Sequence, residues 1–99
     1  MGFADWFQSF INPERKTLGE PIRALIDQAE AHGLPKTDVL VAREFVEHNE
    51  YDLAFEHVVG QLHEYGIPVN AEFYRLLEAI ADRMKLPKQR FVFISELIK

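Results

Sequence analysis

The chain of 99 residues, 47% of them apolar and 27% charged, is long enough to bury one independent core and too short for two domains. It has no cysteine, which excludes disulfides and thiolate metal sites, and no apolar run approaches the roughly 20 residues that span a bilayer. Sixteen acidic and eleven basic residues give a net charge of −5, which opposes binding to DNA.

The first predicted elements are a short aromatic helix and a polar linker, which together cover residues 1–19. The helix should end before Pro13, because the residue before a proline disfavours the helical conformation. Its apolar side chains share one side: Phe3, Trp6, Phe7, Phe10 and Ile11. We expect this stripe to dock on the bundle formed by residues 20–99, with an exposed interaction patch as the alternative. Asp5 and the lack of a basic region argue against a secretory signal, so we expect a cytoplasmic protein.

Two helices follow, each bounded by residues typical of helix ends. The second helix should begin at Glu20 and Pro21 and end at Gly33. Its predicted buried face is Ile22, Leu25, Ile26 and Ala29. The third helix should cover about Asp38 to His48, with Thr37 as its N-cap. Its predicted buried residues are Leu40, Val41, Phe45 and Val46.

The stretch from Glu44 to Gly66 has the longest helical pattern and the most uneven charge. We expect a helix over about Glu50 to Tyr65, with Asn49 as its N-cap. Its apolar stripe is Tyr51, Ala54, Phe55, Val58, Leu62 and Tyr65. The stretch contains no Lys or Arg but six acids: Glu44, Glu47, Glu50, Asp52, Glu56 and Glu64. One face of this helix is therefore expected to be core and the other acidic.

A fifth helix and a last apolar segment complete the chain. Asn70 should cap the fifth helix. Its predicted core face is Phe73, Leu76, Leu77, Ile80, Ala81 and Met84. Pro87 opens a last helix whose apolar positions are Phe91, Ile94 and Leu97 or Ile98. A short strand within Arg90 to Ser95 is the alternative, because β-branched and aromatic residues are frequent there. The whole pattern predicts an all-α fold, a compact bundle of five to six helices in one domain.

The sequence shows no arrangement typical of catalysis or of cofactor or metal binding. His57 and His63 are six residues apart, so they lie on different sides of a helix and not on the shared face of a metal pair. His48, beside Glu44 and Glu47, is expected to be a solvated histidine at a helix end. The glycines are scattered, so no phosphate-binding loop is expected. We therefore expect no catalytic, cofactor or metal residues and no enzymatic activity.

Charge is distributed unevenly along the chain. Residues 24–82 hold twelve acids and three bases, whereas the two flanks hold four acids and eight bases. An acidic surface without interspersed bases attracts a basic partner and suits sites that recognise phosphate. Nucleases have such sites, because they must attract the nucleic-acid backbone.

Part of the chain is similar to a known family. The run EHNEYDLAFEHVVGQLHEYGIPV, with Tyr74 and Met84 after it, resembles the MafI-like immunity proteins, small bacterial proteins that neutralise a cognate toxin of the contact-dependent-inhibition type. The resemblance covers about residues 40–86, and its matching positions include Leu53, Ala54, Leu62 and Glu64. It implies a toxin-domain partner, which the acidic excess suggests is a nuclease whose active site or substrate path is covered. The expected toxin-binding residues are Glu44, Glu47, Glu50, Asp52, Glu56 and Glu64. Direct contact with nucleic acid or membrane is not expected, and the oligomeric state is left open.

Two other classes of function compete with this interpretation. Ala79 to Phe91 resembles the helix-turn-helix of bacterial repressors, in which residues 79–95 would place Gln89 and Arg90 on DNA. The apolar residues that follow Arg90 are more typical of a buried surface than of a helix that faces a groove. A helical adaptor without a toxin partner is the other alternative.

Overall fold

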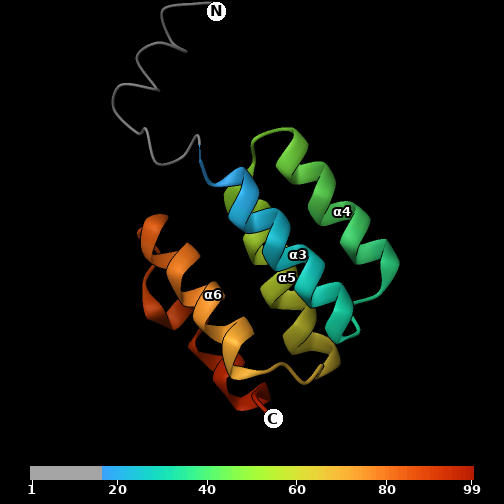
Figure 1. Ribbon diagram of the computed structural model, residues 1–99, viewed down its shortest axis with the longest axis vertical. Coiled ribbons are helices and arrows are strands. Elements are labelled where there is room, and N and C mark those ends of the chain that lie inside the picture. Colours follow the sequence, from blue (N-terminus) through green and yellow to red (C-terminus); the bar gives the residue numbers. More distant parts are fainter. Residues whose placement is uncertain (1–16) are drawn as a thin grey trace, which may run out of the picture.

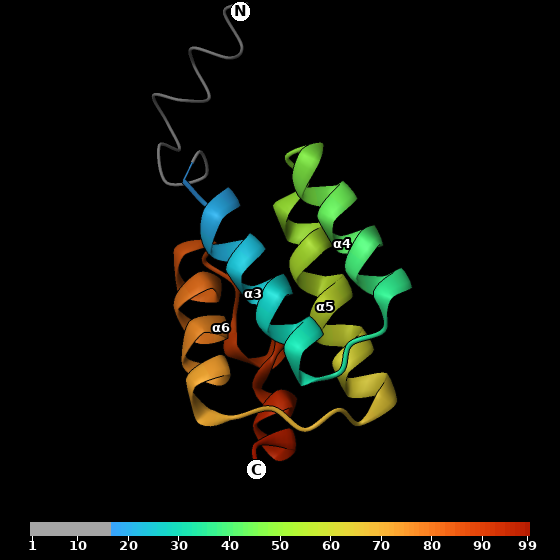
Figure 2. The same ribbon diagram turned by 45° about the vertical axis from the view of Figure 1, so that its right-hand side comes forward.

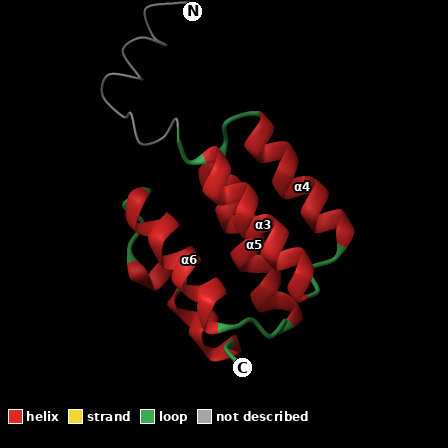
Figure 3. Cartoon of the chain, viewed as in Figure 1, coloured by secondary structure: helices red, strands yellow, loops and turns green. Residues whose placement is uncertain are grey.

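Residues 17–99, the part of the chain that the computed structural model describes, fold into four α-helices and two 3₁₀ segments. They are α3 (Gly19–His32), α4 (Lys36–Glu47), α5 (Tyr51–Tyr65), α6 (Ala71–Arg83), η1 (Lys88–Arg90) and η2 (Val92–Leu97) (Figures 1 and 3). The predicted all-α bundle is confirmed. The predicted aromatic helix, with Phe3, Trp6, Phe7, Phe10 and Ile11, lies outside the described residues. None of the four helices is long and apolar enough to cross a membrane.

Helices α3 and α5 occupy the middle of the bundle, with α4 on one side and α6 on the other (Figures 1 and 2). Helix α3 buries the face that its spacing predicts: Ile22, Leu25, Ile26 and Ala29. Gly33 ends this helix with a φ of 119°, a left-handed conformation that glycine adopts without a steric penalty. Helix α5 buries Tyr51, Ala54, Phe55, Val58, Val59 and Leu62. Tyr65, predicted as part of the same stripe, is 51% exposed.

Helix α4 presents a different face to the core from the one predicted. It begins at Lys36, two residues before the predicted start, and Pro35, not Thr37, is its N-cap residue. Its buried residues are Asp38, Val39, Ala42 and Val46. Leu40 and Val41 are 55% and 39% exposed. Each residue turns a helix by about 100°, so a face built on Val39, Ala42 and Val46 leaves Leu40 and Val41 outside.

The two asparagines that were predicted as N-caps have different conformations. Asn70 confirms the prediction, because its side-chain oxygen accepts a hydrogen bond of 2.8 Å from the Phe73 N–H. Asn49 instead follows the end of α4 in a left-handed conformation, with φ of 59°. The N–H groups of Asn49 and Glu50 bond the carbonyls of Val46 and Phe45, at 2.9 and 2.8 Å. Asn49 therefore ends one helix and does not cap the next.

The C-terminal segment is neither the α-helix nor the strand that the sequence allowed. It forms η1 and η2, and it buries Phe91 and Ile94. A 3₁₀-helix has three residues per turn, so apolar residues at positions 91, 94 and 97 fall on one side of it. The segment ends in a parallel bridge between Ile98 and Val69. The Val69 N–H bonds the Leu97 carbonyl at 3.0 Å, and the Lys99 N–H bonds the Val69 carbonyl at 2.9 Å.

Two leucines of α5 provide a matched test of this arrangement. Leu62 is fully buried, and Leu62→Ala should lower the free energy of unfolding by about 2–5 kcal/mol through lost burial and a residual cavity. Leu53 is 47% exposed, and Leu53→Ala should change the same quantity by less than about 0.5 kcal/mol. Urea unfolding followed by circular dichroism measures both changes. Equal midpoints for the two variants would show that the buried face of α5 is assigned wrongly.

Candidate protein-binding site

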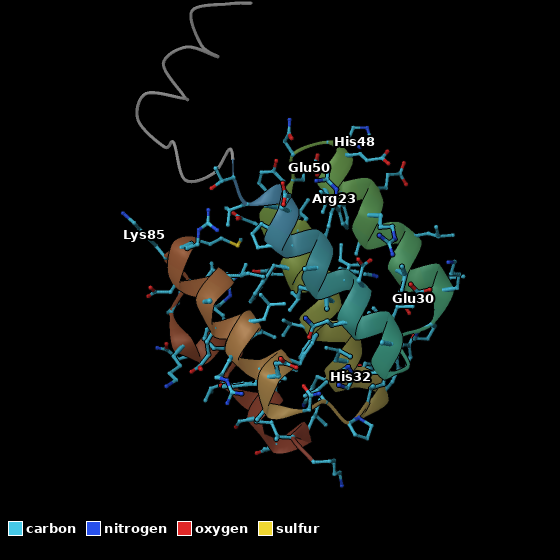
Figure 4. The ribbon with its side chains drawn as sticks, in the orientation of Figure 1. Arg23, Glu30, His32, His48, Glu50 and Lys85 are labelled. Atoms are coloured by element: carbon cyan, nitrogen blue, oxygen red, sulfur yellow. The ribbon has the colours of Figure 1, made fainter. Side chains whose placement is uncertain are left out.

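Three of the six predicted contact residues meet where α4 turns into α5. Glu44 and Glu47 lie in the last turn of α4, and Glu50 is the N-cap residue of α5. We call Glu44, Glu47 and Glu50 the acidic turn. All three side chains are exposed, and none forms an ion pair with another residue in the described part of the chain. Figure 4 shows His48 and Glu50 together at this end of the bundle.

The basic residues of α4 do not neutralise the acidic turn, because they pair with α3. Arg43 contacts Asp27 at 2.8 Å and Glu30 at 3.5 Å. Lys36 contacts Glu30 at 3.3 Å. These pairs are partly or largely exposed, so each contributes at most about 1 kcal/mol to stability. Their effect on the site is to direct the cationic groups of α4 toward α3.

His48 lies between Glu47 and Glu50, and these acidic residues influence the protonation state of its imidazole. The Nδ1 atom of His48 donates a hydrogen bond of 2.9 Å to the Glu44 carbonyl. This hydrogen bond raises the pKa of His48 above its ordinary value of 6.5, and the nearby charges of Glu44, Glu50 and Glu47 raise the pKa further. The net charge of the turn therefore changes as the pH crosses the raised pKa of His48.

A shallow hollow opens beside the acidic turn, between α4 and the start of α5. It has a volume of about 270 Å³ and is lined by Val41, Glu44, Phe45, His48 and Glu50. Val41 and Phe45 form an apolar wall, while the two carboxylates and the imidazole form a polar rim. The hollow can thus accommodate a side chain that is apolar along its length and charged at its end.

A polar cluster that the sequence analysis missed holds α4 against α5. Asp38 is buried, with 7% of its surface exposed. One carboxylate oxygen contacts His57 Nε2 at 3.0 Å and accepts a hydrogen bond from Gln61 Nε2 at 3.1 Å. The other oxygen accepts the Tyr65 hydroxyl at 3.2 Å. This last hydrogen bond raises the pKa of Tyr65, because it stabilises the protonated phenol. The available signal was the four-residue spacing of His57, Gln61 and Tyr65, which places them on one side of α5.

The remaining predicted contact residues are spread along α5. Asp52, Glu56 and Glu64 are exposed, but Glu64 is about 20 Å from Glu50 along the helix axis, at about 1.5 Å per residue. Glu56 forms an ion pair with Arg90 of η1. The structure therefore places Glu44, Glu47 and Glu50 at the connection between α4 and α5, Asp52 in the first turn of α5, and Glu56 and Glu64 farther along that helix.

Residues 79–95 do not form the helix-turn-helix on which the repressor alternative depends. Helix α6 ends at Arg83, and the segment that should be a recognition helix consists of η1 and η2. Two of its apolar residues, Phe91 and Ile94, are buried in the core. Arg90, a predicted DNA contact, is engaged with Glu56. A recognition helix presents several of its residues to the major groove. No α-helix follows α6 in this segment, so it contains no such recognition helix.

Among residues 17–99, no group of three or more His, Asp or Glu side chains is arranged to hold a metal ion. The acidic turn adjoins the hollow and the exposed side chain of Val41. An acidic surface of this kind attracts cationic groups. Comparison with protein-family models, with curated proteins and with solved structures found no match.

The pKa of His48 tests the electrostatics of the acidic turn. A raised pKa means that protonation favours the folded state, a contribution present below pH 6.5 and lost as the pH rises through the folded-state pKa. In the variant Glu44→Gln, Glu47→Gln, Glu50→Gln the pKa should fall only part of the way, because the Glu44 carbonyl remains. NMR titration of the imidazole measures it, with Glu72→Gln as the distant control. A parent pKa at or below 6.5, or one unaffected by the triple change, would contradict this account.

Proposed function

We propose that this chain is an immunity protein, which binds a cognate bacterial toxin domain and covers its active site or substrate path without chemistry of its own. The observation that carries the proposal is the acidic turn, in which none of three exposed carboxylates forms an ion pair with a Lys or Arg in the described part of the chain. The resemblance of residues 40–86 to MafI-like immunity proteins supports the same function. A nuclease is the proposed toxin class, because a cleft that binds phosphates also attracts clustered carboxylates.

The acidic turn is rigidly supported, which favours its use in binding. The end of α4 is fixed by the left-handed conformation of Asn49 and by hydrogen bonds from the N–H groups of Asn49 and Glu50 to carbonyls of α4. Asp38 joins α4 to three side chains of α5. A surface that is already ordered loses less conformational entropy when it binds than a loop that must fold on its partner. The fixed packing of the two helices that carry the turn thus suits tight inhibition.

The proposed contact separates the roles of charge and shape. Carboxylates on a rim chiefly increase the rate of encounter with a cationic partner, and salt weakens this effect. Dissociation is governed more by buried contacts at the centre of an interface. For an inhibitor that must capture its toxin before the toxin reaches nucleic acid, fast association is the property that the acidic turn provides.

Charge reversal at matched positions tests whether the acidic turn guides association. Glu47→Lys, Glu50→Lys should slow association with the toxin domain by about tenfold or more at low salt and should reduce its salt dependence. The control Glu72→Lys, Glu96→Lys makes the same change in net charge in α6 and η2, away from the turn (Figure 1). Stopped-flow association measures both. Similar rates for the two variants would show that net charge, and not the acidic turn, controls the encounter.

A growth-protection assay tests the function itself. Cells that express the toxin domain encoded beside this chain's gene should survive when the parent chain is co-expressed. Gln89→Ala, Arg90→Ala should leave protection intact, because these residues lie outside the acidic turn. Failure of the folded parent to protect would refute the proposal. If the parent also shifted its own upstream DNA in a gel, and the double change abolished the shift, a repressor would be the better interpretation.

A further inference from the structure

The exposed apolar side chains are concentrated on the two helices that carry the acidic turn. Five large apolar residues are exposed among residues 17–99, and four of them belong to α4 and α5: Leu40, Val41, Leu53 and Tyr65. Isolated exposed apolar residues are normal on a protein surface and need no explanation. Here, however, they accompany an open hollow and an acidic rim, which is the pattern of an interface.

Val41 and Leu53 flank one contact between the helices. The Phe45 ring of α4 lies 6.3 Å from the His57 ring of α5, measured between centroids. Val41 is one helical turn before Phe45, and Leu53 is one turn before His57, so each shares a side of its helix with the contact. Helices α4 and α5 run in opposite directions (Figure 2). Since Val41 precedes Phe45 and Leu53 precedes His57 in the chain, the two residues lie on either side of this contact along the helix axes. We call Val41, Phe45 and Leu53 the apolar strip.

We propose that the apolar strip and its hollow receive a cationic, amphipathic segment of the partner. An Arg or Lys side chain would enter the hollow, with its methylene groups on Val41 and Phe45 and its charged end between Glu44 and Glu50. An apolar neighbour in the same segment would cover Leu53. This inference rests on the proposed function and names the chemistry of the toxin surface that binds.

The size of the hollow favours a side chain over a free small molecule. Its volume of about 270 Å³ is below the roughly 300–1,000 Å³ of pockets that bind drug-sized ligands. It is also open, and a small ligand would leave much of its own surface in water. A side chain that is anchored by its backbone in a larger interface does not have this disadvantage.

The acidic residues around the hollow favour a basic partner over two other possible occupants of this surface, a second copy of the chain and a membrane. In a symmetric dimer the same patch would meet itself, which would bring Glu44 and Glu50 against their own copies. A membrane surface is disfavoured because its anionic headgroups carry the same charge as Glu44 and Glu50; such headgroups attract basic helices and not acidic ones. Charge complementarity therefore selects a basic protein surface.

Three single substitutions test the apolar strip with a matched control. Val41→Gln and Leu53→Gln remove apolar surface without adding charge, and Gln is a good helix former. Val92→Gln makes the same change at η2, where Val92 is 41% exposed. The probe is the neighbouring toxin domain, inactivated by substitution and immobilised for binding kinetics. Val41→Gln and Leu53→Gln should each raise the dissociation rate about tenfold, with little change in association rate, whereas Val92→Gln should match the parent.

The possible outcomes separate this inference from the proposed function. If the folded parent does not bind the toxin domain, the proposed function fails and this inference fails with it. If the parent binds and all three variants dissociate at the parental rate, only the apolar strip is refuted. A parent that is dimeric in analytical ultracentrifugation, and monomeric after Leu53→Gln, would also overturn it in favour of self-association. Unchanged urea midpoints for the variants ensure that the rates report contacts and not unfolding.

Discussion

The packing of α5 against α3, α4 and η2 is the constraint on which the rest of the molecule depends. Its buried side chains serve different neighbours, as when Phe55 meets Phe91 edge to face at 6.3 Å between ring centroids. Burial of one such side chain contributes about 1.5–3 kcal/mol, whereas an exposed ion pair contributes about 0–1 kcal/mol. The apolar face of α5 therefore contributes more to the stability of the fold than the charged residues on the surface do.

The contact between α4 and α5 adds a specific polar interaction to this apolar packing. Asp38 has three partners on α5, and its buried carboxylate would lose them if α4 slid by one turn. A buried polar group without a partner costs about 1–3 kcal/mol, and a charged one costs more. The cluster thus fixes the alignment of the two helices. The acidic turn is placed by the same alignment, because it is the short connection between them.

The sequence predicted correctly those helices whose apolar side chains are also the ones buried in the bundle. The core faces of α3 and α6 follow directly from apolar spacing, and Asn70 and Gly33 mark helix ends as expected. Helix α4 was misjudged because apolar content was taken as burial. Leu40 and Val41 are apolar and exposed, while Asp38 is charged and buried. Only the position of α5 decides which face of α4 is inside, and that position is a tertiary property.

The candidate site was predicted in part. Acid-rich sequence identified Glu44, Glu47 and Glu50, which are close in the chain and therefore close in space. It could not reveal that Arg90, 34 positions after Glu56, returns to neutralise it. Asn49 was misassigned because asparagine suits both a helix start and a left-handed helix end. The two roles differ in backbone conformation, which the sequence alone does not specify at a connection of a few residues.

The bridge between Val69 and Ile98 has a consequence for the order in which the chain folds. Helices α3 and α4, and likewise α4 and α5, are connected by short turns, so the contacts within each of these pairs close small loops. The bridge joins residues 29 positions apart and encloses the whole of α6. Closing a loop of that length costs about 3 kcal/mol of chain entropy before any contact is gained. We expect the first three helices to assemble early, with the C-terminal segment joining them in a later step that secures α6.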